Sequence, residues 1–98
     1  MENIILHVTY TCKPGMAEVF VNTIKERGLQ EKVRAEDGCM QYDYFISREA
    51  PDTVLLLEMW RDADACTVHT TLPTIQEIRA LGKEHSLNID VKRFSCRP

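Results

Sequence analysis

The sequence predicts an α+β fold with the element order βαββαβ and a four-stranded antiparallel sheet. Four stretches carry apolar residues at alternate positions, which is typical of half-buried strands. Two longer stretches repeat apolar residues every three or four positions, as on the buried face of a helix, and they follow the first and the third strand. At 98 residues, the chain is expected to form a single domain, residues 1–98.

The first third of the chain is predicted to form a strand and a helix. Residues 4 to 11 alternate, with His7 on a mixed face and four apolar residues on the other face: Ile4, Leu6, Val8 and Tyr10. Residues 13 to 15, Lys-Pro-Gly, end this strand. Residues 16 to 24 then repeat apolar side chains at helical spacing. The repeat slips at Gly28, where we expect a kink or a short second helical segment.

The middle of the chain is predicted to form a hairpin. Residues 39 to 47 alternate, with Tyr42 and Tyr44 on one face, and a five-residue loop follows at residues 48 to 52. The next strand, residues 53 to 61, is apolar on both faces, which indicates that both faces are covered. Glu58 is the one carboxylate among these aliphatic residues, so it needs a partner if it is buried.

The last third is predicted to form a helix and a strand. Asp62 is a good N-cap, and four residues would share the inner face of the helix: Ala65, Val68, His69 and Leu72. Pro73 interrupts the pattern, and residues 74 to 77 form a capping box that we expect to restart the helix at Thr74. His85 lies in a polar segment and is expected to be exposed. Residues 87 to 96 alternate and predict the fourth strand.

The topology leaves one face of the sheet without helices. Right-handed crossovers of this element order place both helices on the same side. The other face, with apolar residues from at least the third strand, would then be bare, and a large bare apolar face is a binding surface. The simplest cover is a second copy of the chain packed sheet to sheet with two-fold symmetry, so the sequence predicts a homodimer.

Composition argues against several classes of function. The net charge is −3 and no run of Lys or Arg is present, which disfavours nucleic-acid binding. No apolar run could span a membrane, and the N-terminus does not resemble a signal peptide, so a cytoplasmic protein is expected. The four cysteines are expected to be free thiols, and neither cysteine nor histidine has the spacing of a metal site.

Four short motifs, in this order, resemble one known family. They are residues 13–15 leading to Phe20, residues 36–42, residues 57–62 and residues 69–73. Over nearly its whole length the chain resembles the antibiotic biosynthesis monooxygenase (ABM) domain, most of all the small quinol monooxygenases and the autoinducer-2-degrading relatives. The resemblance implies a ferredoxin-like fold that dimerises through its sheets into an α+β barrel. It also implies a pocket between helices and sheet in each subunit.

The resemblance further implies the oxidation of a small quinol, or a similar electron-rich aromatic, by O₂ without a bound metal or flavin. The protein would supply a dry cavity, a base and polar groups that hold the substrate. One position departs from the family pattern, because Thr74 stands where many relatives carry a second histidine. Two other functions remain open: a non-catalytic dimer that binds a small molecule in a stress response, and an isomerase or degradative enzyme acting on an autoinducer-like ketone.

His69 is the candidate catalytic base, because histidine changes charge near neutral pH and this one lies on an inner helical face. The alternative is a core histidine held by one hydrogen bond. Six residues are candidates for contact with the substrate: Trp60, Glu58, Tyr42, Tyr44, His7 and Leu72. Glu58 could instead orient His69 or pair with an arginine (Arg61, Arg79 or Arg93). Plain packing is the alternative for the tryptophan and the tyrosines.

Overall fold

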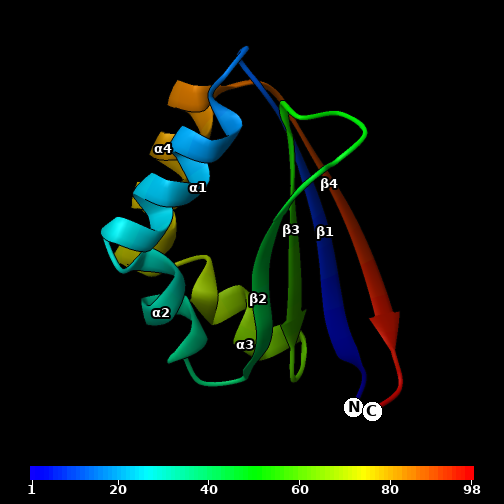
Figure 1. The fold of residues 1–98 in the computed structure, drawn as a ribbon. Helices are drawn as coiled ribbons and strands as arrows, with labels where there is room; N and C mark the ends of the chain where they lie inside the picture. The colour runs from blue at the N-terminus through cyan, green and yellow to red at the C-terminus, as the bar shows by residue number, and fades with distance from the viewer.

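The computed structural model describes all 98 residues, and it contains one sheet and four helices. The elements in chain order are β1 (Asn3–Cys12), α1 (Ala17–Glu26), α2 (Leu29–Arg34), β2 (Cys39–Ile46), β3 (Thr53–Trp60), α3 (Ala63–His69), α4 (Pro73–His85) and β4 (Ser86–Cys96). The strands pair antiparallel in the order β2-β3-β1-β4, and all helices lie on one face of the sheet (Figure 1). The predicted ferredoxin-like α+β fold is therefore confirmed.

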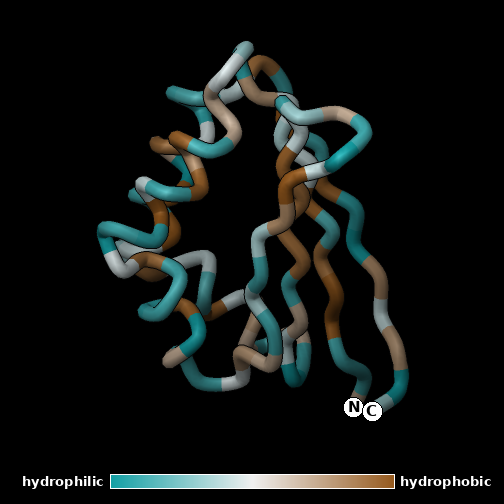
Figure 2. Tube along the Cα trace, in the orientation of Figure 1, coloured by the Kyte–Doolittle hydropathy of each residue, from teal (hydrophilic) through white to brown (hydrophobic).

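The core lies between the helices and the sheet, because each element turns its apolar side chains toward that layer. Alternate residues of β3 are buried there (Val54, Leu56, Glu58 and Trp60). The most hydrophilic stretches of the helices lie on the outer side of the layer, away from the sheet (Figure 2). None of the helices has the length and hydropathy that crossing a membrane requires. The four cysteines are free thiols.

Gly28 divides the first helical region, as the slip in the apolar repeat predicts. Its backbone has a φ of 69°, in the left-handed region that glycine adopts without strain. The chain changes direction there, and the apolar side chains on both sides of the break reach the same core. Phe20 and Ile24 of α1 and Leu29 and Val33 of α2 are all at most 1% exposed.

Three predictions about the second helical region are wrong. Thr74 does not cap a restarted helix, because α4 begins at Pro73 with Leu72 in the N-cap position. Proline fits this first helical position, where its missing N–H would have had no partner within the helix. The helix also continues to His85, which is buried, with its Nδ1 2.8 Å from the carbonyl oxygen of Leu81. In α3, Val68 is exposed rather than on the inner face.

The other face of the sheet, which we call the open face, is uncovered in the single chain (Figure 1). It carries the alternate residues of each strand, and its apolar members are Ile5, Phe45, Leu55, Leu57, Met59 and Phe94. Phe45 and Phe94 are 48% and 52% exposed. The prediction that one face of the sheet lacks helices is therefore confirmed, while the second copy that would cover the open face stays a prediction.

Candidate functional site

The connection between β3 and α3 places His69 against the end of the sheet. β3 ends at Trp60, and Asp62 then caps α3 as predicted, accepting a hydrogen bond from the backbone N–H of Ala65 at 2.8 Å. His69, the last residue of α3, is 2% exposed and stacks on the indole of Trp60, with ring centroids 4.5 Å apart. The stacked indole holds the imidazole in one plane inside the protein.

The side chain that orients His69 comes from the loop between α2 and β2. Glu36 Oε1 lies 2.6 Å from His69 Nδ1. A carboxylate in this position accepts the N–H of Nδ1, so the neutral imidazole carries its free lone pair on Nε2. Nε2 is buried without a hydrogen-bond partner, and so is the second carboxylate oxygen of Glu36. An unpartnered Nε2 in this tautomer can accept a proton, as a general base must.

Glu58 brings a second carboxylate close to the other ring nitrogen. Its Oε1 accepts a hydrogen bond from the indole N–H of Trp60 at 3.0 Å and lies 4.0 Å from His69 Nε2. Burial raises the pKa of Glu58 to about 7, while the hydrogen bond from Trp60 opposes this rise by stabilising the charged form. Glu58 can therefore hold or release a proton near neutral pH.

Of the two alternatives left open for Glu58, an ion pair with an arginine (Arg61, Arg79 or Arg93) is not formed. Arg61 binds Asp37 and Asp62 instead, and the other two arginines form no salt bridge. Of the expected alternatives, the structure favours the one in which Glu58 lies beside His69.

A cavity of about 200 Å³, which we call the inner pocket, lies between the sheet and α4. Three of its polar lining residues are His69, Glu58 and Tyr42, and much of its remaining wall is aliphatic, including Leu6, Ile75 and Val91. The lining residues of β3 are buried, whereas most of those from α4 and both of those from β4 are exposed. The mouth of the inner pocket is therefore between α4 and β4, and His69 lies at its inner end.

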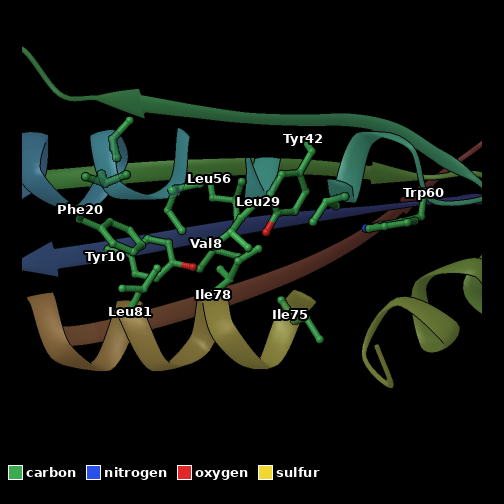
Figure 3. Packing of buried hydrophobic residues seen from close by; sticks show 14 of the residues in the cluster. Val8, Tyr10, Phe20, Leu29, Tyr42, Leu56, Trp60, Ile75, Ile78 and Leu81 are labelled. Carbon is green, nitrogen blue, oxygen red and sulfur yellow. The ribbon is translucent and has the colours of Figure 1, made fainter. Parts of the chain in front are cut away.

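Tyr42 supplies a hydroxyl group to the inner pocket. It stands opposite Glu58 in the β2–β3 pairing and is fully buried, between the sheet and the helices (Figure 3). Its hydroxyl accepts a hydrogen bond from the hydroxyl of Tyr44 at 3.5 Å. Burial raises the pKa of Tyr42 well above its ordinary value, so the group stays protonated and can donate a hydrogen bond to a bound oxygen.

The remaining predicted site residues lie outside the inner pocket. Trp60 stands behind His69, and Tyr44 contacts Tyr42 from outside the pocket wall. Leu72 lines a second cavity of about 290 Å³, which we call the outer pocket. It lies on the Glu36 side of the imidazole, and its other lining residues include Glu36, Arg61, Val68 and His69. His7 is on the open face, paired with Leu57 and Lys92, and the structure does not bring it to the site.

Sequence reasoning did not identify several residues of the site, among them Glu36, Tyr10, Arg79 and Lys83. Glu36 lies in one of the motifs that resemble the family, but no local pattern reveals its contact with a residue 33 positions away. A signal did exist for the two cations, because Ile75, Arg79 and Lys83 recur every four residues on α4. That spacing places all three on one helical face. No group of three or more His, Cys, Asp and Glu residues is placed to hold a metal ion.

Comparison with known proteins gives one family. A family model described as "Antibiotic biosynthesis monooxygenase" matches residues 3–81. The chain is also 34% identical, over 91 residues, to a Bacillus subtilis protein named "Putative monooxygenase YcnE", and the match covers 92% of this chain and 94% of the relative.

Solved structures share the fold over almost the full length. PA3566 from Pseudomonas aeruginosa superposes with a TM-score of 0.84 at 26% identity, covering 100% of this chain and 97% of that one. A Nitrosomonas europaea structure titled "Putative antibiotic biosynthesis monooxygenase" gives a TM-score of 0.82 at 18% identity, covering 98% and 89% of the two chains. At that identity, the second likeness concerns the fold alone.

Proposed function

Because this chain belongs to the antibiotic biosynthesis monooxygenase family, we propose that it oxidises a small quinol or a similar electron-rich aromatic with O₂, without a bound cofactor. The observation that carries the proposal is the geometry of His69. Its Nδ1 is held by Glu36, its Nε2 has no partner, and its side chain lines an apolar cavity. The mainly hydrophobic lining supports an aromatic substrate better than a sugar-like ketone.

The proposed reaction takes all its electrons from the substrate. A quinol and O₂ give a hydroxyquinone and water, so one oxygen atom enters the ring and the other leaves as water. The four electrons needed to reduce O₂ come from the quinol. His69 Nε2 would remove the phenolic proton, and the Glu36 carboxylate would stabilise the imidazolium that results. The phenolate that this leaves is the electron-rich species that reacts with O₂.

The surrounding residues would hold that phenolate and keep water away. The Tyr42 hydroxyl can donate a hydrogen bond to a substrate oxygen. Glu58 lies beside Nε2 and titrates near neutral pH, so it can take up a proton released at the inner end of the pocket. The aliphatic walls leave the phenolate poorly solvated, which favours transfer of its electrons.

Oxygen uptake with a panel of naphthoquinols tests this proposal. We expect uptake above the rate of autoxidation, and loss of that excess in His69→Ala. Thr67→Ala is the matched control, since it removes an exposed side chain of the same helix that touches neither pocket. Full uptake in His69→Ala would contradict the role of His69. Binding of naphthoquinols without uptake by the wild type would favour the non-catalytic binding dimer.

We also propose that the protein is a homodimer that packs the open faces of two sheets together. The apolar side chains of that face have no cover in the single chain, and Phe45 and Phe94 are about half exposed. Two-fold symmetry lets the same patch cover itself. Sedimentation velocity should therefore give twice the mass of the chain.

The cytoplasm is the compartment that we propose, because free thiols persist under reducing conditions.

A further inference from the structure

Two cations stand at the mouth of the inner pocket without partners. Arg79 and Lys83 both line the pocket and are both exposed, one helical turn apart on α4. Neither forms a salt bridge or a side-chain hydrogen bond, so both charges are free to meet an anion at this opening. The chain as a whole has a net charge of −3, but the opening of this pocket carries two unpaired positive charges.

The only acidic residue among those lining the inner pocket lies at its inner end. Glu58 is buried beside His69, and it forms no salt bridge with Arg79. Asp90 of β4 is opposite Thr9, so its side chain is on the open face and away from the mouth. The pocket is therefore polarised, with a carboxylate at the inner end, aliphatic walls in the middle and two cations at the mouth.

A ligand that matches this polarity has an aromatic body and one anionic end. Its ring would lie against the aliphatic walls, with a hydroxyl group at His69. A carboxylate substituent at the inner end would be buried without a cationic partner, whereas at the mouth it would meet the guanidinium group and the ammonium group. The same arrangement would fix the direction in which the ring enters, because only one end of such a ligand is anionic.

We propose that Arg79 and Lys83 form an anion-binding subsite and that the substrate is an aromatic hydroxy compound carrying a carboxylate. The oxidation of such a compound rests on the proposed function, whereas its binding to Arg79 and Lys83 does not. Arg79 makes the larger contribution, because a guanidinium can donate two parallel hydrogen bonds to one carboxylate, while Lys83 adds a single point charge.

Isothermal titration with two non-reacting ligands tests the subsite. The ligands are 6-hydroxy-2-naphthoate and its methyl ester, which share the ring and a hydroxyl group at the end opposite the carboxyl group but differ in charge. We expect the wild type to bind the carboxylate about tenfold more tightly than the ester, as charge-assisted hydrogen bonds allow. Added NaCl should reduce that preference, since exposed charges are screened.

The variants decide which residues carry the preference. Arg79→Gln should weaken carboxylate binding about fivefold and Lys83→Gln about twofold, which together account for the tenfold preference, and neither change should alter ester binding. Lys32→Gln is the matched control, because it removes an exposed lysine of α2 that lines no pocket. Thermal unfolding of each variant verifies that the fold is retained.

Three results would overturn the subsite: no binding of the carboxylate by the wild type, equal affinity for both ligands, or an equal loss in Lys32→Gln. Oxygen uptake does not enter these titrations. A protein that prefers the carboxylate but consumes no O₂ would keep the subsite and lose the proposed reaction. A protein that consumes O₂ with neutral quinols but binds the carboxylate and the ester equally well would keep the proposed reaction and lose the subsite.

Discussion

The two faces of the sheet are built from alternate residues of the same strands, yet they have opposite characters. On the covered face, the polar residues of β2 and β3 are gathered at one end, where Tyr42, Glu58 and Trp60 meet His69 under the helices. On the open face, the centre is apolar and His7 has no place in a cavity. Burial of polar groups in contact with one another marks a chemical site, whereas exposed apolar groups mark a surface for association.

The largest expected effect concerns the chemistry of the covered face. His69→Ala removes the group that accepts the substrate proton, and general-base catalysis contributes about 10²–10⁴-fold to rate. We expect kcat for quinol oxidation to fall within that range while the far-ultraviolet circular dichroism is unchanged. An unchanged kcat in a folded variant would remove His69 from the mechanism.

Glu36→Gln tests whether the carboxylate on Nδ1 matters as a charge. Glutamine keeps the shape but cannot stabilise an imidazolium, and we expect a loss of about 10–100-fold, the size found for carboxylate partners of metal-bound histidines. Glu36 does not line the inner pocket, so we expect kcat to fall by this amount and KM to change little. A rise in KM alone would indicate that Glu36 only shapes the pocket.

Leu56 and Leu57 are adjacent residues on opposite faces of β3, and they form a matched pair. Leu56 is 1% exposed, so Leu56→Ala should lower the free energy of unfolding by about 2–5 kcal/mol through loss of packing. Leu57 faces the open side, so Leu57→Lys should leave the fold intact but give a monomer. Urea unfolding measures the first effect and sedimentation velocity the second. A Leu57→Lys variant that stays dimeric would contradict assembly through the open face.

Glu58 gives a smaller, pH-dependent effect on stability. Burial raises its pKa to about 7 from an ordinary value of 4.5, so the folded protein favours the protonated form. The stabilisation is complete below about pH 4.5 and is lost as the pH rises through 7, where the buried group must ionise. Relative to Glu58→Gln, the wild type should lose on the order of 2 kcal/mol between pH 5 and pH 8. A constant difference between the two proteins would show that Glu58 is not strained by burial.

The fold could be predicted because its signals are local. The strand alternation, the left-handed Gly28 and the Asp62 cap each depend on a few neighbouring residues, and the structure confirms them. The start of α4 was open to error, because proline either breaks a helix or begins one, and the sequence around Pro73 is compatible with both. His85 was misplaced because α4 continues to His85, which packs against the Phe20 ring of α1.

The site could be predicted only in part, because it depends on contacts between distant segments. His69 and Glu58 were found since a histidine and a carboxylate among aliphatic residues are unusual in themselves. Glu36 was missed because its partner is 33 positions away, and only the packing of α3 against the loop after α2 joins them. The alternation in β1 separates His7 from the apolar face, but it does not say which cavities that face will line.

Mass spectrometry of the product formed under ¹⁸O₂ tests the central claim most directly. The wild type would be supplied with a naphthoquinol in unlabelled water and quenched early, before the product oxygens exchange. A monooxygenase predicts one ¹⁸O atom in each hydroxynaphthoquinone molecule, and no labelled product above the autoxidation level in His69→Ala. An unlabelled quinone, with both oxygen atoms of O₂ recovered as hydrogen peroxide, would contradict the account.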